Sequence, residues 1–149
     1  MCLTITNPKK NFIERILNID SYKPLYKIAN KDLTFYKVVK MIGIGYFTPF
    51  YSTPIQLNIP YKNNLPIDII ESSSLCYDIT SGVFHLCETY KSAEILKNKQ
   101  YSLHGQCYKV LKAIVPKGTK YYEGFFLFFG DSYPSIGTEC VIYKEINEE

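Results

Sequence analysis

A strand that is apolar on both faces lies between Tyr108 and Val115, in the sequence YKVLKAIV. Successive side chains of a strand point to opposite faces, and apart from two lysines the side chains on both faces of this strand are apolar. A strand of this kind is normally interior to a sheet, with other layers covering both of its faces. We therefore expect this strand to lie at the centre of the fold.

The residues after this strand predict a turn. Pro116 has no N–H to donate to a sheet, and its fixed φ suits the second position of a turn in which Gly118 takes the fourth. The chain should then reverse and continue into Phe125–Phe129, which reads FFLFF. Five consecutive large apolar residues are not expected on the open surface of a monomer, so they predict either core or a contact surface.

Size and composition indicate one domain over 1–149 that acts in the cytoplasm. Hydrophobic residues make up 46% of the 149 residues, and no apolar run is long enough to span a membrane. The N-terminal sequence lacks the apolar core of a signal peptide. Five cysteines, an odd number without a CxxC pair, predict reduced thiols rather than a disulfide framework.

The charge pattern does not favour nucleic-acid binding. The formal net charge is only +3, and the basic residues are scattered rather than grouped in a block. All of them except Arg15 are lysines, so the chain has few of the planar guanidinium groups that bind phosphate with two hydrogen bonds. We expect the partner to be a protein or a small molecule.

The predicted fold class is α+β, a mainly antiparallel, strongly curved sheet with two short helices. An asparagine cap followed by a proline predicts a helix over 8–18. The sheet core is predicted over 83–143, with one helix that Thr89 caps and that ends near Asn98. Residues 48–74 carry four of the eight prolines and predict a flap of two edge strands, joined by a hairpin and serving either as a lid or as a passive cover.

Two histidines and two cysteines could in principle coordinate zinc: His85 and Cys87 on one strand, and His104 and Cys107 before the next. Their spacing is not typical of a zinc site, so we predict no metal and no cofactor. His85 and Cys87 are also too far apart along a strand, about 6 to 7 Å, to form a nucleophile and base in direct contact.

The aromatic residues give the clearest indication of a binding surface. The chain has 14 tyrosines and 9 phenylalanines, more than a core of this size needs. A tyrosine ring with its hydroxyl suits the stacking of a base or the lining of a partner surface, although it also suits the edge of a core. The candidate ligand-binding residues are Tyr36, His85, Tyr121, Tyr122, Glu123, Tyr133 and Glu139.

Four segments resemble small uncharacterised domains encoded by bacteria and their phages. The segments are YKVV (Tyr36–Val39), SGVFHLC (Ser81–Cys87), VPKGTKYYEG (Val115–Gly124) and SYPSIGTECVIY (Ser132–Tyr143). The resemblance covers about Leu33 to Tyr143 and implies a prokaryotic or viral setting. It brings no activity with it.

The order of these segments also resembles the layout of ADP-ribosyltransferase-type domains. That resemblance implies a related fold and places Glu139 where the family has its catalytic glutamate. The chain departs from the family at two motifs. Tyr36 or Lys37 replaces the Arg or His of the opening strand, and His85-Leu86-Cys87 replaces a Ser-Thr-Ser segment.

Three functional hypotheses follow. The first is a non-enzymatic binding module whose aromatic face near Tyr121, Tyr122 and Tyr133 binds a partner protein or a nucleotide-like small molecule. The second is an enzyme that acts on NAD or a related nucleotide through Glu139 and His85. The third is a homo-oligomer or structural subunit that associates through Phe125–Phe129.

Overall fold

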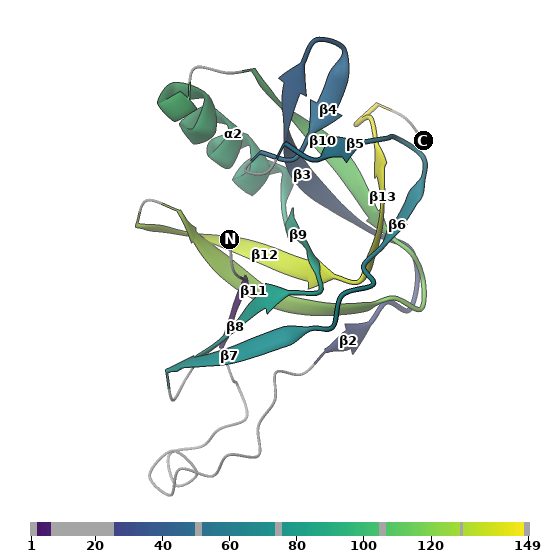
Figure 1. Ribbon diagram of the computed structural model, residues 1–149, viewed down its shortest axis with the longest axis vertical. Coiled ribbons are helices and arrows are strands. Elements are labelled where there is room, and N and C mark those ends of the chain that lie inside the picture. Colours follow the sequence, from purple (N-terminus) through teal and green to yellow (C-terminus); the bar gives the residue numbers. More distant parts are fainter. Residues whose placement is uncertain are drawn as a thin grey trace, which may run out of the picture.

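The computed structural model describes residues 3–6, 26–49, 52–73, 76–104, 107–128 and 130–147. These residues form one sheet of thirteen strands and one helix, α2 (Tyr90–His104) (Figure 1). The strands are β1 (Leu3–Thr6), β2 (Lys27–Ile28), β3 (Leu33–Ile42), β4 (Gly45–Phe47), β5 (Pro54–Ile55), β6 (Pro60–Lys62), β7 (Asp68–Ser73), β8 (Cys76–Ser81), β9 (Phe84–Cys87), β10 (Tyr108–Val115), β11 (Lys120–Phe128), β12 (Asp131–Thr138) and β13 (Cys140–Lys144).

The predicted fold class, α+β with two short helices and an ADP-ribosyltransferase-like layout, is wrong. The fold is mostly antiparallel β-sheet, and the part of the chain described here contains a single helix. The helix predicted over 8–18 lies outside the described residues. Most of the described segments are short and contain β-branched and aromatic residues, which favour strands over helices.

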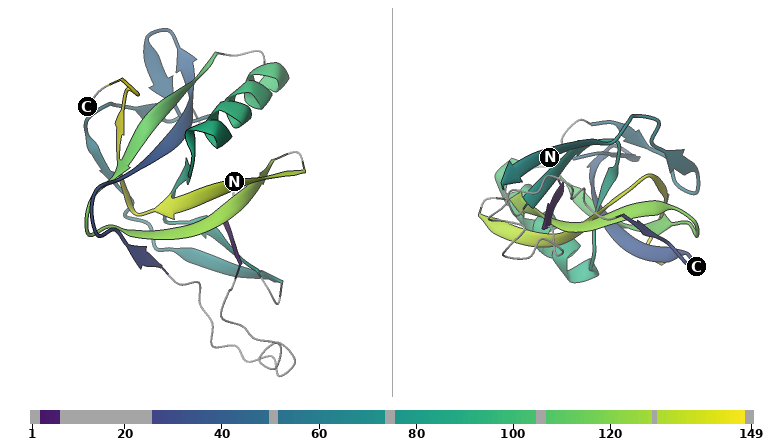
Figure 2. Two further views of the ribbon diagram at one scale, coloured as in Figure 1. Left: turned by 180° about the vertical axis from the view of Figure 1, so that it is seen from behind. Right: turned by 90° about the horizontal axis from the view of Figure 1, so that it is seen from below.

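The sheet follows the order β6-β13-β10-β3-β9-β12-β11-β1-β8-β7. Two branches leave this path, since β2 pairs with β11 while β4 pairs with β3 and β5. The sheet is not closed, and β6 and β7 are the two ends of the path. Seen from behind and from below, the long strands of the sheet are strongly curved (Figure 2).

The prediction that residues 108–115 form an interior strand is confirmed. This strand, β10, pairs with β13 on one side and with β3 on the other. Leu111, Ala113 and Val115 are fully buried in the main hydrophobic cluster. On the opposite face, Val110 is buried against the cluster that α2 covers, so both faces of the strand carry packing.

The predicted turn is present, but its residue positions differ. The Thr119 N–H donates to the carbonyl oxygen of Pro116 at 3.1 Å, so Pro116 is the first residue of the turn and Gly118 the third. Gly118 has a φ of +87°, which a type II turn requires at its third position and which glycine adopts without steric cost. The turn does not make a hairpin, because β10 and β11 pair with different strands.

The proline-rich segment 48–74 does not form the predicted hairpin. Instead, β5 pairs with β4, β6 with β13, and β7 with β8. The strands β6 and β7 lie at the sheet ends, as expected of edge strands. The residues between them, 63–67, therefore cross from one end of the open sheet to the other instead of turning back.

The helix α2 begins as the sequence predicts and continues six residues beyond the predicted end. The Ser92 N–H donates to Oγ1 of Thr89 at 3.1 Å, which satisfies one of the free donors of the first turn. Ala93 and Leu96 are buried against the sheet, in a cluster that includes Val38. No helix in the described part of the chain has both the length and the apolar character that a membrane span requires.

We predict that Gly124→Ala weakens the fold. A Cβ at this position on β11 would overlap the carbonyl oxygen of Thr4 on the neighbouring strand β1, so the two backbones would have to separate. The free energy of unfolding should fall by about 2 kcal/mol or more, as measured by urea denaturation. Gly43→Asn is the control, because Gly43 has open space around it and a φ of +61° that asparagine tolerates. Equal stability of wild type and G124A would contradict this packing.

Candidate functional site

The sheet opens at the middle of β3. On one side, β3 pairs with β10 from Leu33 to Lys40. On the other side, it pairs with β9 only at Tyr36 and with β4 only from Lys40 to Ile42. The strands β9 and β4 thus meet β3 at different points along its length (Figure 1). Lys37 lies in the interval between these two pairings.

A cavity of about 450 Å³ lies at this opening. We call it the β3–β9 cavity. It borders β3, the β4–β5 connection, the segment that crosses between the sheet ends, and the β8–β9 connection. Its walls are formed by Lys37, Thr48, Pro49, Thr53, Asn63, Leu65, Thr80, Ser81, Gly82, Val83, Phe84 and His85.

Lys37 is an inward-facing lysine at this opening. It lies between Phe35 and Val39, which both pack in the main core, and its cross-strand neighbour Leu111 is fully buried. Direct cross-strand neighbours in an antiparallel pair point to the same face. The Lys37 Nζ donates a hydrogen bond of 2.8 Å to the backbone oxygen of His85, on the edge of β9 that faces the opening.

The surroundings of Lys37 disfavour its charged form. Burial lowers the pKa of its ammonium from 10.5 to about 8, against a smaller raising effect of Cys87. Among the described residues that line the cavity there is no aspartate or glutamate to pair with the ammonium. A lysine in such surroundings carries an appreciable fraction of neutral amine near neutral pH.

The imidazole of His85 is neutral and has an unsatisfied ring nitrogen. Its Nε2 is buried without a hydrogen-bond partner. Burial is the main reason that the pKa of His85 falls to about 3, and the charge of Lys37 lowers it further. The cross-strand neighbour of His85 is Gly137, which has no side chain to hydrogen-bond with the ring.

Cys87 is not an activated nucleophile. It is buried in the cluster beneath α2 together with Val38, and burial raises the pKa of its thiol to about 11. Its neighbour His85 is a very weak base at the pKa just given, so the pair does not supply a thiolate. Within the described ranges, no group of three or more His, Cys, Asp or Glu side chains is arranged to hold a metal ion.

The three tyrosines of the predicted aromatic face do not lie on one face. Tyr121, Tyr122 and Tyr133 are 9%, 6% and 4% exposed, and each belongs to a different hydrophobic cluster. Tyr121 and Tyr122 are adjacent on β11, so their rings point to opposite sides of the sheet. The Tyr133 ring stacks on Phe126, with 5.4 Å between centroids. Placing the three rings on one surface from the sequence was therefore wrong.

The other predicted residues are also dispersed. The Tyr36 ring packs edge-on against Tyr90 of α2, with 5.6 Å between centroids. Glu123 is exposed and forms an ion pair of 2.8 Å with Lys27. Glu139 lies between β12 and β13, where its backbone N–H donates to the Lys120 carbonyl. Of the predicted site residues, only His85 borders the β3–β9 cavity.

Lys37 was not among the predicted site residues, although the sequence carries a signal for it. In Phe35-x-Lys37-x-Val39, a lysine occupies an inward position of a strand whose other inward residues are apolar. A charged residue in such a register is uncommon, because burying the charge is costly unless the group is paired. The alternation alone could have drawn attention to this position.

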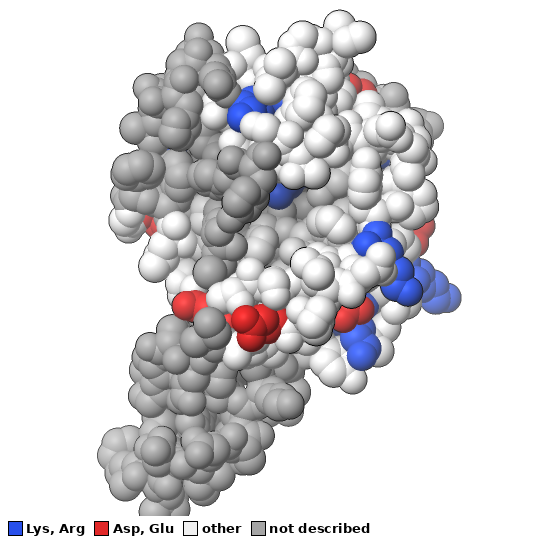
Figure 3. Space-filling model, in the orientation of Figure 1, with Lys and Arg blue, Asp and Glu red and all other residues white. Residues whose placement is uncertain are grey.

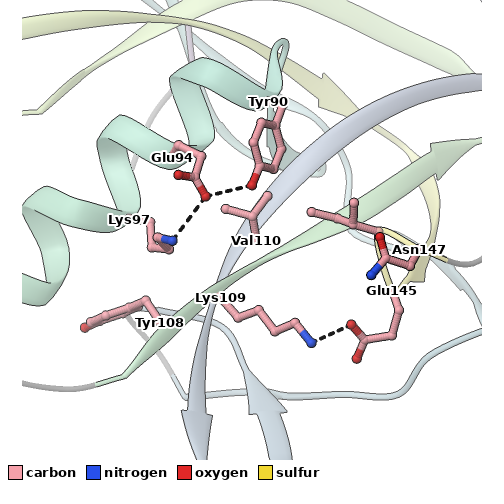
Figure 4. Close-up of a pocket in the computed structure, with 9 residues that line it drawn as sticks. Tyr90, Glu94, Lys97, Tyr108, Lys109, Val110, Glu145 and Asn147 are labelled. Carbon is pink, nitrogen blue, oxygen red and sulfur yellow. Dashed lines mark hydrogen bonds and ion pairs between the residues drawn. The ribbon is translucent and has the colours of Figure 1, made fainter.

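A second cavity, of about 310 Å³, lies between α2, the start of β10 and the residues after β13 (Figure 4). Its charged groups are already paired with one another. Glu94 accepts hydrogen bonds from Tyr90 and Lys97, at 2.8 and 3.1 Å, and Lys109 forms an ion pair of 2.6 Å with Glu145. These bonds lower the pKa of both carboxyls. A ligand would have to displace partners that already satisfy the site.

The surface charge adds no basic patch on the visible face. On the face shown in Figure 3, the described surface is largely uncharged, and its lysines are interspersed with acidic side chains.

No family model, curated protein or solved structure matches this chain.

We predict that Lys37→Met raises the free energy of unfolding at pH 7 by about 1–2 kcal/mol, because relief of the desolvation of the ammonium outweighs the loss of its hydrogen bond to the His85 carbonyl. Since the pKa is about 8 in the native protein against 10.5 for an ordinary lysine, the unfolded chain binds more protons than the native chain between these pH values. Wild-type stability should therefore rise across that window, and the advantage of the variant should shrink. Urea unfolding at pH 7 and pH 10 measures both effects.

The control for this comparison is Lys117→Met, at an exposed position in the turn before β11. This variant should change the free energy of unfolding by less than about 0.5 kcal/mol at either pH. Wild-type stability that does not rise between pH 8 and pH 10 would show that the Lys37 ammonium is favourably solvated in the native protein, contrary to the lowered pKa described above.

Proposed function

We propose that this protein is a non-enzymatic binding module for a small organic molecule that occupies the β3–β9 cavity. The observation that carries the proposal is the Lys37 ammonium, placed in a cavity of about 450 Å³ without a carboxylate among the described lining residues. That volume lies within the range of natural ligand pockets, which are mostly apolar with a few polar groups that fix orientation. We expect the protein to act in the cytoplasm.

The lining indicates the chemical class of the ligand. Pro49, Leu65 and Phe84 supply apolar wall, while Lys37 supplies one cationic donor. A carboxylate or carbonyl oxygen on the ligand would accept a charge-assisted hydrogen bond from this donor and would restore favourable surroundings to the ammonium. A flat apolar body with one acceptor end fits these features, and nucleobase-bearing molecules belong to this class.

A binding role is favoured over catalysis by the acid–base properties of the neighbouring groups. A general acid or base works best with a pKa near the ambient pH. His85 has a pKa of about 3 and the Cys87 thiol a pKa of about 11, so neither is suited to proton transfer at neutral pH. Lys37 alone remains, and a single lysine that donates hydrogen bonds is sufficient for binding.

The proposal predicts that small acceptor-bearing ligands perturb backbone amide resonances around the cavity. Benzoate, nicotinamide, uridine and adenosine monophosphate are suitable probes, because they share a flat ring with an acceptor and differ in charge. At least one should shift the amides of Thr53, Ser81 and Phe84, which border the cavity. Lys37→Met should weaken binding of that probe by about tenfold or more, a loss of about 1.4 kcal/mol.

Lys109→Met is the matched control, because it removes a lysine from the second cavity instead. That variant should bind the same probe with unchanged affinity. Shifts that gather around α2 and disappear in Lys109→Met would contradict the proposal and place binding in the second cavity. The absence of shifts at the β3–β9 cavity with all four probes would also contradict it.

A further inference from the structure

We propose that Lys37 forms a reversible covalent imine with aldehyde- or ketone-bearing molecules that enter the β3–β9 cavity. This inference rests on the proposed function, since the carbonyl compound must first occupy the cavity. It adds a bond-forming chemistry to a site that otherwise binds by hydrogen bonding and apolar contact.

The position of Lys37 provides the nucleophile. Its Nζ is held by one hydrogen bond, to the His85 backbone oxygen, and a neutral amine can donate that bond while keeping its lone pair. The cavity that Lys37 borders has a volume of about 450 Å³, which is enough for a small carbonyl compound. Without an acidic residue among its described lining, the cavity contains no carboxylate that would hold the amine in its protonated form.

The protonation state of Lys37 supports the same chemistry. With a pKa of about 8, roughly a tenth of the Lys37 amine is neutral at pH 7. An ordinary lysine with a pKa of 10.5 is neutral in only about one molecule in 3,000 at that pH. The Lys37 amine is therefore present in its nucleophilic form in a much larger fraction than a surface lysine, as in other lysines activated by desolvation.

The reaction is balanced without an oxidant or reductant. The Nζ lone pair attacks the carbonyl carbon, a C–N bond forms, and the carbonyl π electrons move to oxygen. The two protons that were on the neutral amine leave with that oxygen as water when the C–O bond breaks, and a C=N bond remains. The neutral imine nitrogen has no hydrogen, but its protonated form keeps one N–H that can donate to the His85 carbonyl oxygen, and this protonated form is the one that cyanoborohydride reduces.

The experiment is reductive trapping with benzaldehyde and sodium cyanoborohydride at pH 7, followed by peptide mapping by mass spectrometry. Lys37 should be labelled at least about tenfold faster than any surface lysine, because its larger neutral fraction outweighs the lower nucleophilicity of a less basic amine. Benzoate, which cannot form an imine, should slow the labelling of Lys37 by competing for the cavity. Lys37→Met should lose the fast phase, and Lys109→Met should keep it.

The outcomes separate this inference from the proposed function. Fast, benzoate-protected labelling of Lys37 supports the imine. If benzoate binds at the cavity but Lys37 is labelled no faster than surface lysines, the imine is overturned while the binding function stands. If benzaldehyde modifies only surface lysines and no probe of the earlier panel binds at the cavity, both are overturned. Circular dichroism of the variants, compared with wild type, confirms that each has folded.

Discussion

The position of one partly buried lysine, Lys37, where a sheet divides is the constraint on which the candidate site depends. β3 pairs with β10 along one side, but on its other side β9 and β4 each pair with only part of its length. At the interval between them, the His85 carbonyl lacks a strand partner on β3 and accepts a hydrogen bond from Lys37 instead. Buried backbone acceptors are nearly always satisfied, and here a side chain replaces a missing strand contact.

This arrangement predicts that the site carries a cost in stability. Apolar neighbours such as Leu111 and Val39 make the position of Lys37 favourable for an apolar side chain and unfavourable for a charged one. Replacing a residue that serves binding often raises the stability of the protein. A ligand that presents an acceptor to Lys37 would offset part of this cost, which links occupancy of the cavity to the stability of the fold.

The sequence predicted local features well where a single strand or cap determines them. β10 is apolar on both faces and is interior, and Thr89 begins α2. Features that depend on which strands meet were not predictable from local pattern. The connection 63–67 crosses between sheet ends instead of forming a hairpin, because β6 pairs with β13 rather than with β7. The prediction of an aromatic face was wrong for the same reason, because adjacent tyrosines on a strand point to opposite sides of the sheet.

The pKa of Lys37 in the native protein is the most direct test of this account. Heteronuclear NMR of protein labelled with 13C-lysine can follow the Cε resonance of Lys37 with pH, and the assignment follows from its disappearance in a variant at this position. The account predicts a titration midpoint near 8, well separated from the surface lysines. A midpoint at the ordinary lysine value near 10.5 would contradict it, because the amine would then be solvated rather than buried at the opening of the sheet.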